Sequence, residues 1–268
     1  MTLFNENQVR ERLATPNGLL GIDVFHGDGP IKWSALKDAN RFYAWIKATE
    51  GGDWQDELFE NNRDGAHAGG VIPGAYHFFH PKTSVQSQID NFCSKVGAMR
   101  SGELPPSLDL ENPKEWKFKP ELAEQHKAAW QSLTVENRVK IVLQWLEAVE
   151  KRLGIRPIIY AGKSFVDEIL GNDPRLAKYL LWLPRYNVDE PEVPEPWTHY
   201  NWWQYSEHGS IPAATDHELD LNVFAGTLDD LRALCFGAQA RADETDDSAT
   251  PWYERCPFTR WIRRLFGW

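Results

Sequence analysis

Two carboxylates, Asp109 and Glu111, lie two residues apart in the short apolar run PSLDLE at residues 106–111. Side chains alternate along a strand, so both carboxyls would face one side, and Leu108 and Leu110 the other. Two carboxyls on one face repel when both are ionised, which raises the pKa of one of them. A carboxyl that stays protonated near neutral pH can act as a general acid, and glycoside hydrolysis uses two carboxyls with separated pKa values. The pattern alone fits a metal site or an exposed strand edge equally well.

Other apolar runs of strand length, rich in β-branched or aromatic residues, must supply the rest of the fold. Together with the first run they occupy residues 21–25, 42–48, 71–79, 106–111, 157–161, 179–183, 200–205 and 218–224. The segments between the early runs carry apolar residues at helical spacing, at 56–69, 84–99, 120–153 (one helix or two) and 164–170. Little helix is predicted between the runs at 179–183, 200–205 and 218–224, where the connectors are rich in Pro, Glu, His and Gly.

This alternation of strand and helix predicts an α/β fold with a parallel sheet and crossover connections. Eight strands favour closure into a TIM-like (β/α) barrel. Because helices are scarce late in the sequence, we expect an irregular barrel with helices missing from the C-terminal part.

In such a barrel the chemistry is found at the carboxyl ends of the strands. Carboxylates occur there in the first, fourth and eighth strands, and burying them apart would be costly, so we expect them to converge. The polar and aromatic candidates at these ends are Asp23, Lys47, Thr49, Glu50, Tyr76, His77, Asp109, Glu111, Tyr160, Trp182, Arg185, Gln204, Tyr205, Asp220 and Asn222.

Aromatic rings near the strand ends allow two interpretations. Rings can cover the apolar faces of sugars, or they can simply fill the barrel, since aromatic side chains dominate protein cores. The rings in question are Tyr76, Phe78, Tyr160, Trp182, Trp203 and Tyr205.

Several polar residues have simpler explanations than catalysis. Lys47 and Glu50 fit a structural ion pair at the barrel floor. His77 and His80 could ligate a metal, but histidines beside aromatic rings are more often structural, so neither a metal nor another cofactor is expected. Asp56 fits a residue that fixes the loop after the second strand.

The composition excludes several classes of protein. With 42% hydrophobic and 25% charged residues, the 268-residue chain is typical of a globular protein, and no apolar stretch is long enough to span a bilayer. A net charge of −10 disfavours nucleic acid as a partner. The cysteines Cys93, Cys235 and Cys256 are too few and scattered for a disulfide framework or a zinc motif.

Taken together, the motifs resemble the glycoside hydrolase family 25 lysozymes, the Chalaropsis-type muramidases. The resemblance covers roughly residues 20–232, in the order and spacing of the family. The segments that carry it are GIDV at 21–24, IKATEGGDWQDELFENN at 46–62, AGGVIPGAYHFFHP at 68–81, LDLE at 108–111, RPIIYAG at 156–162, LWLPRY at 181–186, WWQYSEHGSIP at 202–212 and LDLNVF at 219–224.

The resemblance implies a bacteriolytic hydrolase that cleaves the β-1,4 bond between N-acetylmuramic acid and N-acetylglucosamine in peptidoglycan. By match to the family motifs, Glu111 is the general acid/base. Asp109 is the second carboxylate, which either attacks the sugar or orients its acetamido group. Asp23 and Asp220 match the other acidic positions of the groove. Tyr76 and Gln204 match the wall of the groove. From their places at the strand ends we also expect Tyr160, Trp182, Tyr205 and Glu50 to bind substrate.

Two departures from the family pattern lie on the first loop. Phe25 stands where members often carry serine, and Ile31-Lys32-Trp33 stands where many carry Ile-Asp-Trp. Neither removes a carboxylate, so they bear on substrate preference and not on the reaction.

We predict a catalytic barrel at residues 1–238, an acidic linker at 239–251 and a basic aromatic tail at 252–268. In the tail, apolar residues from Phe258 to Trp268 share one face of a short amphipathic helix and three arginines share the other. This pattern is typical of binding to a membrane surface or lipopolysaccharide, and a helix docked on the barrel explains it equally well.

The N-terminus lacks the pattern of a secretory signal. We therefore expect a monomeric, antimicrobial enzyme made in the cytoplasm that reaches the cell wall or periplasm either as a phage endolysin released through a holin or as a secreted effector. A glycosidase acting on another N-acetylhexosamine polymer, a non-catalytic peptidoglycan-binding module and a membrane-active protein that kills through its tail are the alternatives.

Overall fold

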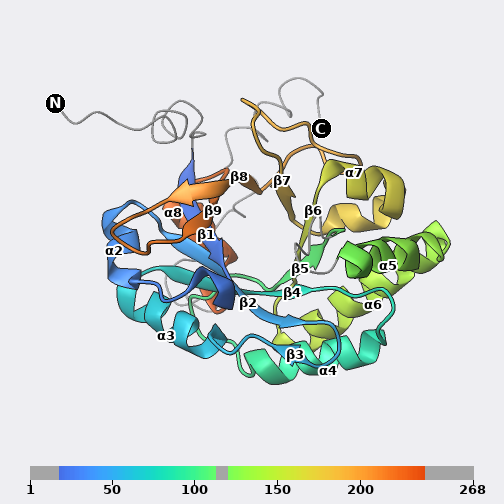
Figure 1. Cartoon of the computed structure of the whole chain (residues 1–268), viewed down its shortest axis with the longest axis horizontal. Helices are drawn as coiled ribbons and strands as arrows, with labels where there is room; N and C mark the ends of the chain where they lie inside the picture. The colour runs from blue at the N-terminus through green and yellow to red at the C-terminus, as the bar shows by residue number, and fades with distance from the viewer. Residues whose placement is uncertain (1–17, 113–119, 239–268) are drawn as a thin grey trace, which may run out of the picture.

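The computed structural model describes residues 18–112 and 120–238, and its central feature is a closed barrel (Figure 1). Eight strands pair in the circular order β1-β2-β4-β5-β6-β7-β8-β9, and the short β3 adds to β2 outside the barrel. The eight-stranded barrel predicted from the sequence is confirmed. The strands are β1 (Leu19–Val24), β2 (Tyr43–Glu50), β3 (Trp54–Gln55), β4 (Ile72–Phe78), β5 (Ser107–Leu110), β6 (Ile158–Ala161), β7 (Leu181–Pro184), β8 (Trp202–Ser210) and β9 (Glu218–Phe224).

The last barrel strand corrects the prediction of a wholly parallel sheet. Strand β9 runs antiparallel to both β8 and β1, while the other barrel pairings are parallel. The β8–β9 connection, residues 211–217, is shorter than the dozen or so residues that a parallel crossover needs. The start of β9 therefore lies at the carboxyl end of β1, where Asp220 pairs in register with Asp23.

Helices cover the outside of the barrel on the side of the early strands. Thr134 caps the start of α6 by accepting a hydrogen bond from the Asn137 amide, so the predicted stretch at 120–153 forms two helices. Figure 1 shows α3 to α6 along the lower and right-hand sides. The helices are α2 (Trp33–Asp38), α3 (Phe59–Gly69), α4 (Val85–Val96), α5 (Pro120–Gln131), α6 (Val135–Leu153), α7 (Lys163–Phe165) and α8 (Leu228–Leu234), with short turns η1 (His26–Asp28), η2 (Val166–Leu170) and η3 (Pro174–Lys178).

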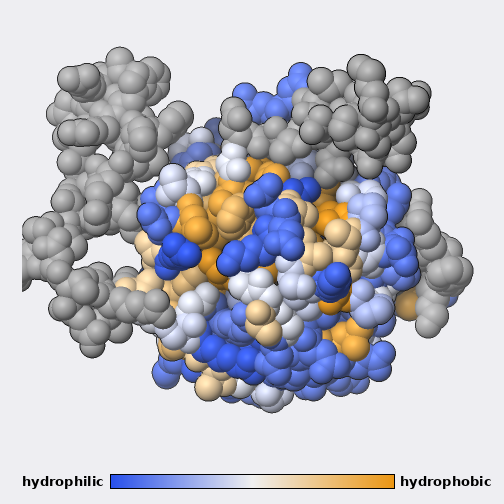
Figure 2. All heavy atoms as spheres, turned by 90° about the vertical axis from the view of Figure 1, so that its left-hand side faces the viewer, coloured by the Kyte–Doolittle hydropathy of each residue, from blue (hydrophilic) through white to orange (hydrophobic). Residues whose placement is uncertain are grey.

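The ring of helices is incomplete, as predicted. Between the start of β7 and the end of β9, the described chain forms no helix. Figure 2 views the molecule from the left-hand side of Figure 1, where apolar side chains gather in the upper part of the face and hydrophilic ones cover the lower part. No helix among the described residues is long and apolar enough to span a membrane.

Aromatic side chains fill the barrel interior. The rings of Trp45 on β2 and Trp182 on β7 stack with centroids 5.2 Å apart, and Trp202 on β8 meets Trp45 edge-on. Strands β2 and β7 are not neighbours in the sheet, so this contact crosses the interior. A Cβ added to Gly74 would lie 2.6 Å from the Trp45 ring, which explains a glycine inside β4. Many of the tryptophans are thus packing residues.

The predicted linker at 239–251 and basic tail at 252–268 lie outside the described residues. Leu231 on the last described helix, α8, and Cys235 directly after it belong to the interior hydrophobic cluster. The domain boundary at residue 238 stays a prediction.

Candidate active site

Asp109 lies inside the barrel, and Glu111 lies at its mouth. Asp109 is in the middle of β5, in register with Phe78 on β4 and Tyr160 on β6. It is 7% exposed, and its Oδ1 atom has no hydrogen-bond partner among the described residues. Burial, together with the charge of Glu111, raises the pKa of Asp109 well above its ordinary value, although the Lys47 ammonium opposes this shift. Glu111 follows the last residue of β5 and is half-buried.

Asp23 and Asp220 form a second pair of carboxylates at the same end of the barrel. They stand opposite each other on β1 and β9. Burial raises the pKa of Asp23 to about 6, against hydrogen bonds from Asn222 and Gln204 that favour its ionised form. The pKa of Asp220 is also raised well above its ordinary value, first by burial and then by the charge of Asp23. The carboxylates of the first, fourth and last strands therefore converge, as the sequence predicted.

Gln204 joins these carboxylates to the tyrosines of the barrel mouth. Its Nε2 atom donates to Asp23 Oδ2 at 2.8 Å and to Asp220 Oδ2 at 3.0 Å. Its Oε1 atom accepts from the hydroxyls of Tyr160 at 2.8 Å and Tyr186 at 2.6 Å. Both ends of the amide are used, so the orientation of Gln204 is fixed. These bonds connect β1, β6, β8 and β9 across the mouth.

Trp182 contributes to the site through Asn222. The indole Nε1 of Trp182 donates to Asn222 Oδ1 at 2.8 Å, and Asn222 Nδ2 donates to Asp23 Oδ2 at 2.7 Å. Trp182 is 2% exposed, and its ring packs edge-on against Tyr160 and Tyr76. It therefore positions polar groups and does not present a free ring face to a ligand.

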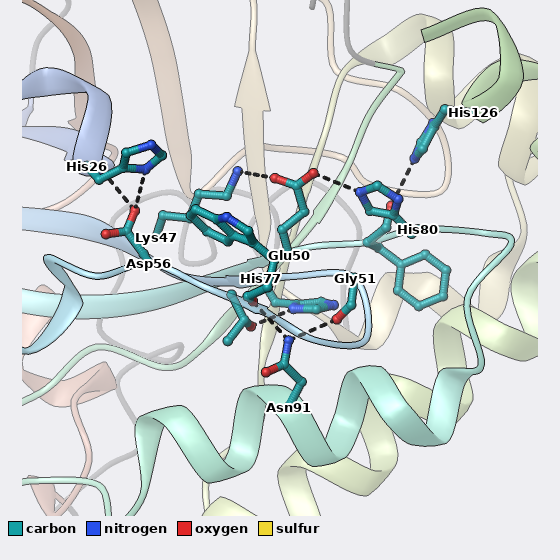
Figure 3. A network of polar contacts seen from close by, with 12 residues as sticks. His26, Lys47, Glu50, Gly51, Asp56, His77, His80, Asn91 and His126 are labelled. Atoms are coloured by element: carbon teal, nitrogen blue, oxygen red, sulfur yellow. Dashed lines mark hydrogen bonds and ion pairs between the residues drawn. The ribbon is translucent and has the colours of Figure 1, made fainter. Parts of the chain in front are cut away.

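A branch of polar side chains, Lys47 and Glu50 on β2 and His80 after β4, lies at the carboxyl end of β2 (Figure 3). Lys47 Nζ lies 2.6 Å from Glu50 Oε2, and His80 Nε2 lies 2.9 Å from Glu50 Oε1. Burial alone would raise the pKa of Glu50, but the His80 hydrogen bond and the Lys47 charge outweigh it and lower the value to about 2. The ion pair expected from the sequence is present, but it lies at the carboxyl end of β2 and not at the barrel floor.

His77 lies outside this branch and is structural. Gln88 accepts from its Nε2 atom at 3.1 Å, and its Nδ1 atom lies 2.7 Å from the Thr49 hydroxyl. Its ring stacks on Trp145 of α6, and burial lowers its pKa to about 3. Both ring nitrogens are engaged, so His77 is not placed to bind a metal together with His80.

An open cleft of about 880 Å³ borders the carboxylates. It lies beyond the carboxyl ends of β5, β6 and β7, and residues around it include Glu111, Tyr160, Lys163, Arg185, Tyr186 and Glu207. Glu111 is the one of the four predicted catalytic carboxylates that lines this cleft. A substrate in the cleft would therefore meet Glu111 first, with Asp109 behind it.

Not every predicted binding residue lies at the site. Tyr205 belongs to the hydrophobic cluster outside the barrel, and its ring contacts Trp203. Gln204, its neighbour in β8, faces the interior, so strand alternation turns Tyr205 outward. The sequence carries a weaker signal for two further residues of the site. Tyr186 belongs to the LWLPRY motif, and Asn222 stands out only as a polar residue within a strand.

The geometry assembles four carboxylates, three of them desolvated by burial, beside an open cleft with polar and aromatic walls. Desolvated carboxyls that interact share protons and titrate as a group. Such a group can deliver a proton to a leaving oxygen while a second carboxylate stabilises positive charge on the reacting carbon. This is the chemistry of glycoside hydrolysis.

Comparison with known proteins agrees with this chemistry. The curated relatives include Lysozyme M1 of Streptomyces globisporus, 32% identical over 230 residues, covering 82% of this chain and 72% of the relative. The N,O-diacetylmuramidase of Chalaropsis sp is 26% identical over 226 residues, covering 81% of this chain and 99% of the relative. The crystal structure of the bacterial lysozyme from Streptomyces coelicolor superposes with a TM-score of 0.74 at 30% identity, covering 83% of this chain and 99% of that one.

The family model described as Glycosyl hydrolases family 25 matches residues 22–214. This match spans more than half of the chain and includes Asp23, Asp109 and Glu111. It confirms the resemblance drawn from the motifs, and with it the assignment of the chain as a glycoside hydrolase. The chain belongs to glycoside hydrolase family 25.

Proposed function

We propose that this enzyme is a muramidase that cleaves the β-1,4 bond between N-acetylmuramic acid and N-acetylglucosamine in peptidoglycan. Its relatives are named as lysozymes and muramidases, which supports peptidoglycan as the substrate. The observation that carries the proposal is the arrangement of β5, with Asp109 buried in the barrel and Glu111 bordering the cleft.

In this proposal Glu111 is the general acid/base. It protonates the glycosidic oxygen as the bond to the sugar carbon breaks, and it later removes a proton from the incoming water. Asp109 is the second carboxylate. Either it bonds to the sugar carbon as a nucleophile, or it orients the substrate acetamido group so that the acetamido oxygen forms that bond. In both routes water releases the sugar and returns the proton to Glu111.

The supporting groups set the charge of this pair. Lys47 favours the ionised form of Asp109, which is the form that either route needs. Asp23, with a pKa of about 6, is ionised at neutral pH and adds negative charge at the mouth beside Asp220, which favours positive charge on a reacting sugar carbon. Gln204 holds both of these carboxylates and the hydroxyl of Tyr160, so it acts as a positioning residue.

Digestion of purified peptidoglycan by the wild type and by Glu111→Gln, followed by mass spectrometry, tests the proposal. We expect the wild type to release muropeptides with reducing N-acetylmuramic acid ends. The substitution should lower the rate by a factor of about 10² to 10⁴, which is the usual contribution of general acid–base catalysis. Glu168→Gln is the matched control, because Glu168 lines the same cleft, is exposed and has no role in the proposed reaction.

The alternatives give different results in the same assay. Cleavage of chitin but not of peptidoglycan would identify a glycosidase for another N-acetylhexosamine polymer. Binding without cleavage of either polymer by the wild type would identify a binding module. Full activity of Glu111→Gln would remove Glu111 from the mechanism.

We also propose that the enzyme acts on the bacterial cell wall as a phage endolysin released through a holin, with delivery by a secretion system as the second route. The support is the sequence at 252–268, a basic aromatic segment on an otherwise acidic chain. Such a segment suits an enzyme that works beside an anionic membrane.

A further inference from the structure

Three aromatic side chains form a continuous platform at the barrel mouth, away from the cleft described above. Phe25 is 38% exposed and Trp54 is 37% exposed, which makes them two of the three exposed large hydrophobic residues in the described part of the chain. The imidazole of His26 lies between them. Its centroid is 5.1 Å from that of Phe25, edge-on, and 5.3 Å from that of Trp54. We call Phe25, His26 and Trp54 the aromatic platform.

The aromatic platform is held rigidly from beneath. Asp56 is 1% exposed, and its Oδ2 atom accepts from the backbone amide of His26 at 2.9 Å and lies 3.2 Å from His26 Nδ1 (Figure 3). Its Oδ1 atom accepts from the Leu58 amide at 2.8 Å. Trp54 is fixed by pairing of β3 with β2 and by a 3.0 Å hydrogen bond from Asn91 to its carbonyl oxygen. These contacts fix the His26 ring and the backbone of Trp54, so less conformational entropy is lost at these positions when a ligand binds.

Contacts through Lys47 connect the aromatic platform to the catalytic carboxylates. Lys47 Nζ lies 5.2 Å from the Trp54 ring centroid and 5.2 Å from the Phe78 ring centroid. Phe78 is in register with Asp109, and the Lys47 charge acts on the Asp109 carboxyl. Phe25 follows Asp23 by two residues on the β1 side. The platform is therefore continuous with the site.

The positions of the cleft and the platform define a path for an extended ligand. The cleft lies at the ends of β5 to β7, and the platform lies at the ends of β1 and β2. An enzyme that cleaves within a polymer must bind sugars on both sides of the broken bond. We expect a glycan strand that fills the cleft and passes Glu111 to extend toward the platform.

The chemistry of the platform suits a pyranose ring. Sugars present apolar C–H faces that pack on aromatic rings, and their hydroxyl and acetamido groups need polar partners at the ring edge. A hollow of about 540 Å³ beside Trp54 offers such partners, and its lining includes Glu50, Asp53, His80, Thr83 and Ser87. Apolar rings beside polar side chains are the usual composition of a saccharide site.

We propose that Phe25, His26 and Trp54 form an accessory subsite that binds one N-acetylhexosamine of the glycan strand at a distance from the bond that is cleaved. This inference rests on the proposed function for the identity of the glycan. The subsite increases the affinity for long glycan strands and leaves the chemical step unchanged.

Binding of peptide-free peptidoglycan glycans of two lengths, a disaccharide and an octasaccharide, tests this subsite by calorimetry. The background is Glu111→Gln, which keeps the ligands intact. We expect Trp54→Ala and Phe25→Ser each to weaken octasaccharide binding about tenfold, equivalent to about 1.4 kcal/mol, and to leave disaccharide binding unchanged. Trp54→Phe keeps an aromatic ring and should retain most of the affinity. Val135→Ala, which removes the third exposed hydrophobic side chain, is the control.

The outcomes separate this inference from the proposed function. Unchanged octasaccharide affinity in both Trp54→Ala and Phe25→Ser overturns the subsite, and so does an equal loss for both ligand lengths. A length-dependent loss supports it. If wild-type protein does not cleave peptidoglycan but the length-dependent loss is seen, the proposed reaction fails and the subsite stands. Thermal unfolding of each variant confirms that the fold is kept.

Discussion

Asp23 shows how a single buried carboxyl can lower the free energy of unfolding of the protein. Its pKa is raised to about 6, chiefly by burial, whereas an unfolded chain has the ordinary value of 3.8. The folded state therefore binds more protons between these values. The stability that Asp23 contributes is present below pH 3.8 and is lost as the pH rises through about 6. At neutral pH the ionised carboxylate is a cost that the fold bears for function.

Replacing Asp23 with asparagine should therefore stabilise the protein at neutral pH. Gln204 and Asn222 both donate to the same oxygen of Asp23, so the amide oxygen of asparagine can keep both bonds. We expect Asp23→Asn to raise the free energy of unfolding by on the order of 1–3 kcal/mol at pH 7, and by less at pH 4.5. Urea unfolding at the two pH values measures the difference. An equal effect at both, or a loss at pH 7, would contradict the argument, and the exposed Asp216→Asn serves as the control.

Single residues also show what the sequence can and cannot reveal about the site. Asp23, Asp109 and Glu111 were found because charged side chains inside apolar strands need a reason to be there. The sequence analysis assigns both Gln204 and Tyr205 to substrate binding, but adjacent residues of a strand face opposite sides. The structure places Tyr205 in the hydrophobic cluster outside the barrel. The role of Tyr186 depends on a hydrogen bond across the mouth to β8, a contact that no local pattern encodes.

At the scale of elements, a buried ion pair joins helix α3 to the chain before β5. Arg63 Nε lies 2.6 Å from Glu103 Oε1, and its guanidinium also donates to the carbonyls of Val96 and Ala98. Burial would raise the pKa of Glu103, but the hydrogen bond from Arg63 and further partners outweigh it and lower the value. The Arg63 guanidinium thus holds together three segments: helix α3, the end of α4 and the chain before β5.

Removing one member of this pair should destabilise the protein more than removing both. Arg63→Met leaves a buried carboxylate without its cation, which typically costs about 3–5 kcal/mol. We expect the double variant Arg63→Met/Glu103→Leu to recover part of this loss. Denaturant unfolding of both variants measures the difference. The exposed pair of Lys178 with Glu147 is the control, and its Lys178→Met change should cost less than about 1 kcal/mol. Equal losses at the two sites would contradict the assignment.

The predicted elements agree with the structure where periodicity is strong. The run at 218–224 coincides with β9, and the helices at 84–99 and 120–153 are present. The direction of β9 was missed because an amphipathic strand has the same pattern in either direction. Helices α2 and α8 were missed because six or seven residues contain too few turns to establish a helical period.

At the scale of the whole molecule, the irregular barrel explains why the site is asymmetric. Helices surround the early strands, and the late strands lack them among the described residues. Strand β9 runs antiparallel to its neighbours, so its start lies at the rim formed by the carboxyl ends of the parallel strands. Asp220, near the start of β9, therefore lies at that rim. A regular barrel would deliver that side chain to the opposite rim. The site thus depends on the one strand that breaks the regular pattern.

The charge of the whole chain leads to a prediction for residues 252–268. The chain carries a net charge of −10, yet this segment contains basic and aromatic residues and few acidic ones. An acidic barrel is repelled by an anionic membrane, whereas basic side chains next to aromatic ones are attracted to it. The segment should therefore bring the enzyme to whole cells and have no part in catalysis.

A truncated protein that ends at Pro251 separates these two roles. We expect it to digest purified peptidoglycan at the wild-type rate, because the matched family region ends at residue 214 and the four carboxylates of the site all precede residue 221. Its lysis of intact cells should fall at least about tenfold, and raised salt should weaken lysis by the full chain because ions screen surface attraction. Neutralising the three arginines at 260, 263 and 264 should reproduce the truncation. Unchanged lysis of cells by the truncated protein would remove the delivery role, and a loss on purified walls would place the segment in the catalytic fold.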